Sequence, residues 1–388
     1  MKYDFHSVPD RSNCGSAKWD AIPGASTEIV PLSVADMEFP TAPAIVDALK
    51  KMLDTTILGY TQPTDAYYDA VCGWLQRRHN YTVTREQIIL TPGVVDGFGL
   101  LIEALSKPGE GVIIFNPVYY PFDRVIRDQQ RTVVNCPLIK NGLRYEIDFE
   151  LFDTLAARED VTLLLFCSPH NPVGRVWTAE ELEKIVAICE KHGVFIISDE
   201  IHNDLIMPGH THTVMATVTP NAKNICAVCT APSKTFNLAG VQCSNIILPE
   251  NRVDAVLAAV KKPYDMLNVF AYTACRAAYE QCEDWLEELL QVIADNGKYV
   301  ENFMAENIPQ ITVIPAEGTY LQWWDCRSLG LELNALEKFM HDAGLWLDEG
   351  YIFGAGGEGF ERINLACSRV TLEKAMARLL KAVKELNH

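Results

Sequence analysis

Short apolar runs alternate with helical patterns between about residue 84 and residue 250, and this alternation constrains the fold more than any other feature of the sequence. The runs span residues 111–115, 161–167, 194–198, 225–229 and 244–248. Because each run is apolar at consecutive positions, both faces of the corresponding strand would be buried, as in a parallel sheet covered by helices. We therefore expect an α/β fold with a mostly parallel central sheet.

One connecting helix can be read directly from the sequence. Thr178 followed by Glu181 forms a capping box, and Gly193 is placed to end the helix. Its apolar face comprises Leu182, Ile185, Val186 and Cys189. This segment is expected to bridge two strands.

The pattern changes after about residue 276. A long amphipathic helix is expected from residue 282 to about 306, followed by strands around 311–315 and 320–324. We therefore expect a large α/β domain and a smaller α+β domain. The expected division is 1–45 for a segment that packs on the small domain or a partner subunit, 46–275 for the large domain and 276–388 for the small one.

Composition excludes several classes of protein. The formal net charge of −18, without a basic block, disfavours nucleic acid as a partner. No apolar run approaches the roughly 20 residues of a membrane-spanning helix, so we expect a soluble chain with no membrane partner. The first residues lack a secretory signal, and the twelve cysteines are therefore expected to be thiols in the cytoplasm.

Four candidate site positions follow the apolar runs or open a helix. In open α/β sheets, ligands bind beyond the carboxyl ends of the strands. Gly93 precedes an apolar helix, whose first N–H groups suit an anion such as phosphate. Asn171, between two prolines, offers an amide held in a rigid loop. By itself, each position also fits an ordinary turn.

The other two positions supply a carboxylate and an amine. Asp199 could pair with a protonated ring nitrogen, and Lys234, if desolvated among small residues, could act as a nucleophile. Taken alone, Asp199 fits a helix cap and Lys234 a solvated side chain. The order of anion-binding turn, amide, carboxylate and lysine is much more specific than any single member.

These residues carry a resemblance that spans nearly the whole chain. The sequence resembles the fold-type-I pyridoxal-phosphate enzymes of the class I/II aminotransferase superfamily, and within it the cystathionine β-lyases of the MalY/PatB type. The segments that carry the resemblance are Lys18–Asp20, Val34–Pro40, Gly59–Tyr60, Asn116–Tyr120, Asp199–His202 and Ser233–Gly240.

The resemblance implies a cofactor, pyridoxal 5′-phosphate, and a role for each matching residue. Lys234 would carry the cofactor as a Schiff base, Asp199 would pair with the pyridine nitrogen, and Asn171 would bind the phenolic oxygen. Tyr119 would stack on the ring and assist proton transfer, and His202 would lie near the phenolic oxygen. The phosphate would be held by Gly93, Val94, Val95, Ser233 and, from the other subunit of a homodimer, Tyr60. The substrate would be bound by Arg369, Asn171 and Ala35, with Arg369 holding the α-carboxylate.

The sequence also departs from the family pattern. Ala231 stands where serine is frequent, which leaves open whether Thr230 binds phosphate instead. Gln242 replaces the arginine of many aminotransferases, a change that favours the lyase branch. Ser33 replaces a tryptophan that is frequent in this branch.

Three weaker signals are set aside, and no metal site is assigned. Residues 354–359 match a dinucleotide-binding fingerprint but precede an alternating strand pattern, so we expect a loop. Cys226 and Cys229 lie three apart on an expected strand and should face opposite sides. His210 and His212 lack a third ligand.

The expected activity is a carbon–sulfur β-lyase that converts cystathionine or related cysteine conjugates to a thiol, pyruvate and ammonia. Removal of the substrate Cα proton by Lys234 would precede elimination. An aminotransferase that uses a 2-oxo acid is the alternative. A regulatory protein that only senses the ligand is disfavoured because the chain lacks a basic helix-turn-helix extension.

Overall fold

The computed structural model describes residues 2–20, 22, 29–55, 57–259 and 266–386. A seven-stranded sheet forms its centre, in the order β2-β10-β9-β8-β7-β3-β4. The strands are β2 (Ile88–Thr91), β3 (Gly111–Ile114), β4 (Thr132–Asn135), β7 (Val161–Cys167), β8 (Phe195–Asp199), β9 (Cys226–Thr230) and β10 (Ser244–Ile247). The expected mostly parallel α/β fold is thus confirmed.

One strand differs from the expected pattern. The strand expected at 244–248 is present as β10, but it runs antiparallel to both β2 and β9. A parallel connection needs a crossover, usually a helix, that returns the chain to the opposite edge of the sheet. The chain between β9 and β10 contains only the short helix α8 (Pro232–Thr235) and a 3₁₀ turn, so it re-enters the sheet from the same edge.

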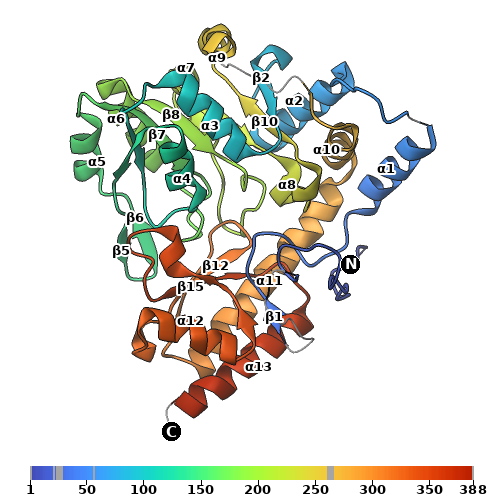
Figure 1. Cartoon of the computed structure of the whole chain (residues 1–388), viewed down its shortest axis with the longest axis vertical. Coiled ribbons are helices and arrows are strands. Elements are labelled where there is room, and N and C mark those ends of the chain that lie inside the picture. The colour runs from blue at the N-terminus through green and yellow to red at the C-terminus, as the bar shows by residue number, and fades with distance from the viewer. Residues whose placement is uncertain (1, 21, 23–28, 56, 260–265, 387–388) are drawn as a thin grey trace.

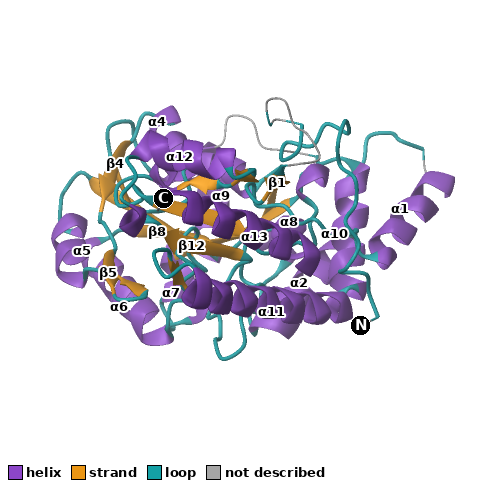
Figure 2. Ribbon diagram, turned by 90° about the horizontal axis from the view of Figure 1, so that it is seen from below, coloured by secondary structure: helices purple, strands orange, loops and turns teal. Residues whose placement is uncertain are grey.

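Helices cover both faces of this sheet (Figures 1 and 2). α3 (Val94–Leu105), α4 (Pro121–Asp128) and α9 (Val253–Ala259) contribute side chains to the apolar cluster on one face. α2 (Asp65–His79), α5 (Phe149–Ala156), α6 (Ala179–His192), α7 (Ala222–Ile225) and α10 (Val269–Gln281) contribute to the cluster on the other. Alternate strand residues divide between the two clusters, as the pleat of a strand requires.

Local signals in the sequence were reliable. The capping box of Thr178 and Glu181 is formed at the start of α6, and Gly193 ends the helix with φ of 72°. Cys226 and Cys229 lie in different apolar clusters, on opposite faces of β9, as expected. All twelve cysteines lie within the described residues, and each is a free thiol. No helix among the described residues is long and apolar enough to span a membrane.

The C-terminal part of the chain forms a second sheet, in the order β11-β12-β15-β14 (Figure 1). Its elements are α11 (Glu283–Asn307), β11 (Thr312–Ile314), β12 (Leu321–Asp325), α12 (Leu333–Asp342), β13 (Leu345–Trp346), β14 (Asp348–Glu349), β15 (Phe360–Asn364) and α13 (Arg369–Leu386). The helix expected at 282–306 and the strands expected after it correspond to α11, β11 and β12. The glycine-rich residues 354–359 form a loop before β15, as expected.

The N-terminal segment crosses to this C-terminal part before α1 (Pro43–Thr55) begins. Its β1 (Val30–Pro31) pairs in parallel with β13, and Phe5 packs against Trp285 of α11. Residues 1, 21 and 23–28 of the segment lie outside the described residues. A hairpin of β5 (Ile139–Asn141) and β6 (Arg144–Glu146) completes the described strands.

Candidate active site

The carboxyl ends of β2, β3, β7, β8 and β9 lie along one edge of the central sheet, since these strands run parallel. The chain that follows each end carries one of the sequence-predicted residues. These are Gly93, Tyr119, Asn171, Asp199 and Lys234. The fold therefore gathers side chains from positions spread over more than a hundred residues, as the topology of an open α/β sheet predicts.

Lys234 lies in the short helix α8, just beyond the end of β9. Its Nζ donates a 2.6 Å hydrogen bond to the carbonyl oxygen of Ala35. Burial, with the nearby positive charge of Arg362 in second place, lowers the pKa of Lys234 to about 8. At neutral to mildly alkaline pH a substantial fraction of this amine is neutral, and only the neutral amine is a nucleophile or base.

Asp199 ends β8 and is buried. Burial raises the pKa of its carboxyl group to about 7, although a 3.2 Å hydrogen bond from the backbone N–H of Ile201 and the charge of Lys234 act in the opposite direction. A buried carboxyl group with this pKa gains stability as an anion only when a positive partner lies beside it. A protonated pyridine nitrogen is such a partner.

Arg362 of β15 faces this edge of the sheet, and sequence reasoning did not select it. Its Nη1 donates a 2.9 Å hydrogen bond to Oδ1 of Asn171, and its Nη2 is bonded to Asp348. The side chain is 3% exposed, and its Nε has no hydrogen-bond partner among the described residues. The guanidinium therefore retains a donor, while the amide oxygen of Asn171 and the carboxylate of Asp348 fix its plane.

Arg369, the residue expected to hold the substrate carboxylate, lies elsewhere. It begins α13, and its guanidinium turns toward α11. There it donates to the Asp295 carbonyl oxygen at 2.7 Å and to Asn296 Oδ1 at 3.2 Å, and it stacks over Tyr299. In the described structure the guanidinium of Arg369 thus contacts α11 and not the residues gathered at the sheet edge. Arg362 lies on strand β15 and points to the edge of the central sheet, whereas Arg369 is the first residue of α13 and points toward α11.

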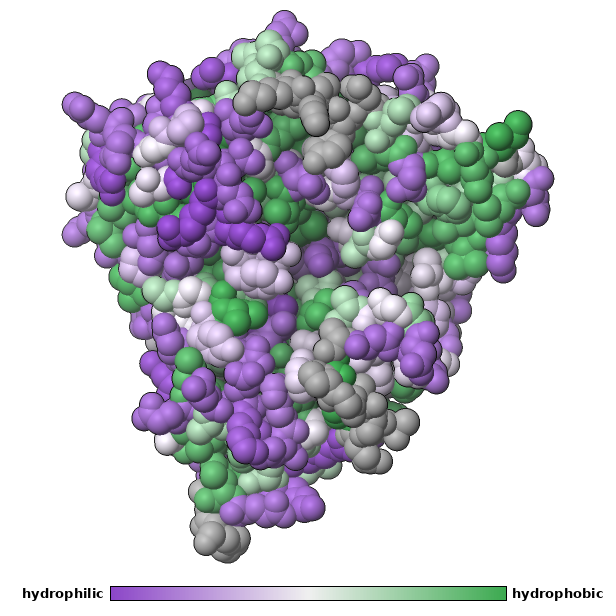
Figure 3. All heavy atoms as spheres, viewed as in Figure 1, coloured by the Kyte–Doolittle hydropathy of each residue, from purple (hydrophilic) through white to green (hydrophobic). Residues whose placement is uncertain are grey.

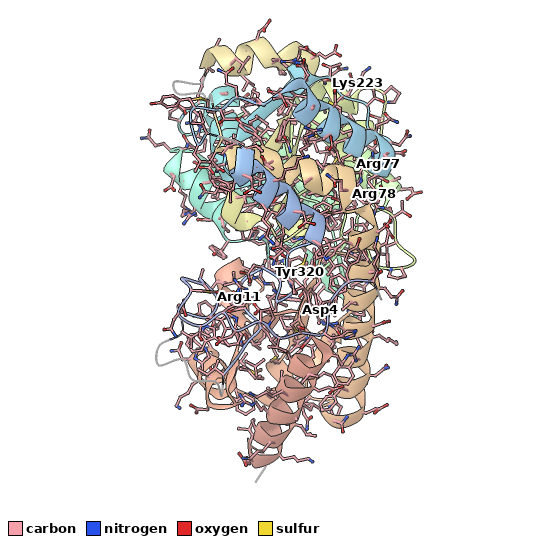
Figure 4. All side chains as sticks on the ribbon, turned by 90° about the vertical axis from the view of Figure 1, so that its right-hand side faces the viewer. Asp4, Arg11, Arg77, Arg78, Lys223 and Tyr320 are labelled. Carbon is pink, nitrogen blue, oxygen red and sulfur yellow. The ribbon has the colours of Figure 1, made fainter. Side chains whose placement is uncertain are left out.

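The N-terminal segment closes the site from the other side. Val34 has a φ of 46°, a strained value for a β-branched residue, and the next residue presents its carbonyl oxygen to Lys234. Two further contacts fix this turn: Tyr320 donates to Ala35 O at 2.8 Å, and the Asn237 amide bonds both backbone groups of Met37. In Figure 4, Tyr320 is labelled at the level where the upper and lower parts of the molecule meet.

The remaining aromatic and imidazole groups near the site are kept neutral by their surroundings. Burial raises the pKa of Tyr119 to about 12. Burial, followed by the charges of Lys234 and Arg362, holds the pKa of His202 well below its usual value. The Nδ1 atom of His202 is buried and lacks a hydrogen-bond partner among the described residues, so this imidazole can still bind a ligand group.

The positions that the sequence predicts for phosphate binding are only partly brought together. Gly93 caps α3, and the backbone N–H groups of Val94 and Val95 belong to its first turn, which lacks intrahelical acceptors. Ser233 lies beside Lys234 in α8 and is half-buried. Thr230 is buried and directs its hydroxyl to the Asn245 carbonyl oxygen, at 3.5 Å.

Tyr60 is not part of the site in a single chain. Its side chain is 98% exposed and belongs to the loop between α1 and α2. Ile57, Leu58 and Leu53 nearby are also exposed. Figure 3 shows apolar surface at the right-hand side of the molecule, where Figure 1 places α1.

Comparison with known protein sequences gives full-length matches. The sequence profile of a family described as aminotransferase class I and II matches residues 27–379. Cystathionine beta-lyase PatB of Bacillus subtilis is 39% identical over 385 residues, which cover 98% of this chain and 100% of that protein. Protein MalY of Escherichia coli is 33% identical over 389 residues, which cover 98% of this chain and 99% of that protein.

Solved structures match over the same extent. The structure of cystalysin from Treponema denticola, which contains a pyridoxal 5′-phosphate cofactor, superposes with a TM-score of 0.97 at 44% identity and covers 100% of both chains. A PLP-bound C-S lyase from Staphylococcus hominis has a TM-score of 0.92 at 29% identity, with 99% of this chain and 98% of that chain covered.

Proposed function

This chain belongs to the aminotransferase class I and II family, and we infer that within this family it is a pyridoxal-phosphate-dependent carbon–sulfur lyase. The observation that carries this function is the full-length similarity to proteins named cystathionine beta-lyase and C-S lyase. The resemblance found in the sequence is confirmed, including its branch.

The residues at the sheet edge fit the cofactor. The charge of Lys234 only partly offsets the burial of the Asp199 carboxyl group, so a pyridinium beside it would stabilise the anion. The buried Nδ1 of His202 lacks a hydrogen-bond partner among the described residues. We assign Lys234 to the cofactor aldehyde, Asn171 to the phenolic oxygen, Tyr119 to the ring face, and the first turn of α3 with Ser233 to the phosphate. Bound pyridoxal phosphate supplies a ring that withdraws electrons from the substrate Cα.

Lys234 is the base in this assignment. With its pKa near 8, the amine can accept the Cα proton of the substrate and return it to the leaving sulfur or to the product. Cleavage of the Cβ–S bond and hydrolysis then convert cystathionine and water to a thiol, pyruvate and ammonia. The carbonyl oxygen of Ala35, which accepts from Lys234, holds the amine at the sheet edge.

Arg362, rather than Arg369, is assigned to the α-carboxylate of the substrate. Its Nε has no protein hydrogen-bond partner among the described residues, whereas Asn171 and Asp348 orient its plane. A planar guanidinium binds a carboxylate through two parallel hydrogen bonds, which a lysine cannot reproduce.

A homodimer is proposed from the exposed loop between α1 and α2. The side chain of Ile57 is 90% exposed and that of Tyr60 is 98% exposed. Exposed apolar side chains that lie close together in this way are typical of a surface that another chain covers. In the dimer, Tyr60 would reach the phosphate of the partner subunit. Replacing Ile57 by Asp should convert the dimer to a monomer in analytical ultracentrifugation, and an unchanged sedimentation coefficient would contradict the proposed surface.

We also place the protein in the cytoplasm, because the twelve free thiols suit a reducing compartment. Cell fractionation tests this assignment.

A product assay tests the function. The purified, cofactor-supplemented protein should convert cystathionine to pyruvate and a free thiol in the absence of any added 2-oxo acid. Strict dependence on a 2-oxo acid, with formation of the corresponding amino acid, would identify an aminotransferase instead.

A further inference from the structure

A second cluster of ionisable side chains lies on α12 and the β14–β15 pair, in the C-terminal part of the chain. Glu337 and His341 are four residues apart on α12, so they project from one face of that helix. Together with Glu349 of β14 they bring one ligand atom each to within 4.8 Å of the others. His341 Nε2 lies 3.7 Å from a carboxylate oxygen of Glu349.

The strand register adds a fourth group. β14 and β15 are antiparallel, with Glu349 opposite Glu361 and Asp348 opposite Arg362. Because neighbouring residues of a strand point to opposite faces, the Asp348–Arg362 ion pair lies on one face and the two glutamates on the other. The positive charge of Arg362 is thus directed away from the glutamates, and two like charges stand opposite each other, which is unfavourable.

Glu361 has no protein group that satisfies it fully. The residue is 2% exposed, and its Oε2 has no hydrogen-bond partner among the described residues. A native protein rarely leaves such a group unsatisfied without a bound ion, water or proton.

His341 is oriented as a ligand would be. Its ring stacks on Trp346 with centroids 3.8 Å apart and an angle of 8° between the planes. Its Nε2 also lacks a hydrogen-bond partner within the described part of the chain.

We propose that Glu337, His341, Glu349 and Glu361 bind one divalent first-row transition-metal ion. One imidazole nitrogen with carboxylate oxygens is a donor set that Mn²⁺ and Zn²⁺ accept. Ligand atoms about 2.1 Å from an ion lie at most about 4.2 Å apart. The ligand atoms of Glu337, His341 and Glu349 lie within 4.8 Å of one another and would close on an ion with small side-chain movements. Glu361, opposite Glu349 on β15, would move toward them as the fourth ligand.

The proposed metal site is separate from the cofactor-binding edge, but Asp348 connects the two. Asp348 precedes Glu349 on β14 and is bonded to Arg362. A bound cation would remove the repulsion between Glu349 and Glu361 and so stabilise the β14–β15 pairing that carries Arg362.

Titration of the full-length protein with MnCl₂, followed by the loss of the free Mn²⁺ signal in electron paramagnetic resonance, tests the proposal. One Mn²⁺ should bind per chain. His341→Ala and Glu361→Gln should each weaken binding at least about tenfold, a size expected for disturbing a coordination sphere. His210→Ala is the matched control, because it removes an exposed imidazole from another part of the chain and should leave binding unchanged.

A second readout is thermal unfolding, in which MnCl₂ should raise the midpoint of the wild-type protein and not that of His341→Ala. Should His341→Ala fail to fold, Glu337→Gln on the half-buried face of α12 carries the same expectation. Equal Mn²⁺ affinity in the wild type and the ligand variants, or no saturable binding to the wild type, would overturn the proposal. Protons shared among the carboxylates would then neutralise the cluster.

Discussion

Lys234 donates a 2.6 Å hydrogen bond to the carbonyl oxygen of Ala35, a residue 199 positions earlier in the chain. The bond joins the loop after β9 to the N-terminal segment, so the amine is enclosed from both sides. Enclosure removes water, and this desolvation is the largest cause of its lowered pKa. The contact therefore positions the amine in the buried surroundings that lower its pKa.

The first prediction concerns the reactivity of this amine. In the cofactor-free protein, labelling of Lys234 by an amine-specific reagent should rise with a midpoint near pH 8, because its pKa is about 8 and only the neutral form reacts. Mass spectrometry of the labelled peptide measures this midpoint. Arg362→Gln should move it to higher pH, since the guanidinium charge lowers the pKa of Lys234. A midpoint near pH 10 in the wild type would contradict the expected environment.

The second prediction separates the two arginines. Arg362→Lys should reduce kcat/KM for cystathionine by about 30-fold, or about 2 kcal/mol, because lysine loses the bidentate geometry of a charged hydrogen bond. Arg369→Lys should change kcat/KM by less than about twofold, since its guanidinium contacts α11 and not the sheet edge. The reverse ranking would return the carboxylate-binding role to Arg369.

The sequence predicted what depends on local patterns. The run at 161–167 coincides with β7, and the capping box of Thr178 and Glu181 begins α6 as expected. Asn171, Asp199 and Lys234 could be selected because a parallel sheet brings the residues after its strands to one edge. These signals extend over a few neighbouring residues, so no knowledge of distant contacts was needed.

The sequence did not reveal features that depend on distant contacts. The hydrogen bond between Lys234 and Ala35 and the direction of β10 arise only when the chain is folded. Arg362 could have been found, since Glu361 and Arg362 place two adjacent charges in a strand whose residues are all buried. A buried arginine needs partners, which is itself a sign of a site.

The third prediction is a pH dependence of stability due to Asp199. Folding raises the pKa of this group from 3.8 to about 7, so the folded protein binds the proton more tightly than the unfolded chain does. Its contribution to stability is therefore fully present below pH 4 and is lost as pH rises through 7. Asparagine does not titrate. In the cofactor-free protein, the free energy of unfolding of Asp199→Asn should therefore rise relative to that of the wild type as the pH increases from 4 to 8, by on the order of 4 kcal/mol.

Urea unfolding of both proteins across this pH range measures the difference. Ile197→Val in the same strand is the control, because it removes a methylene group without changing a titrating side chain and should give a constant difference. A difference between Asp199→Asn and the wild type that does not vary with pH would show that burial does not raise this pKa.

The last prediction concerns Lys18, whose side chain is 1% exposed. Its Nζ lies 2.9 Å from Asp36 Oδ1 and 3.1 Å from Glu38 Oε1, and donates to the Asp36 carbonyl oxygen at 2.7 Å. Lys18→Met would leave two largely buried carboxylates with one cation fewer, and breaking a buried ion pair in this way costs about 3–5 kcal/mol. Chemical denaturation should show a loss of that size.

The control is Lys338→Met, which removes an exposed lysine from its 2.6 Å pair with Asp342 on α12 and should change stability by less than about 0.5 kcal/mol. Because Asp36 directly follows Ala35, Lys18→Met should also loosen the turn that holds Lys234 and weaken pyridoxal phosphate binding, measured by equilibrium dialysis. A variant that loses stability but keeps full cofactor affinity would show that the bonds from Asn237, Tyr320 and Asn364 hold the turn at Val34 without Lys18.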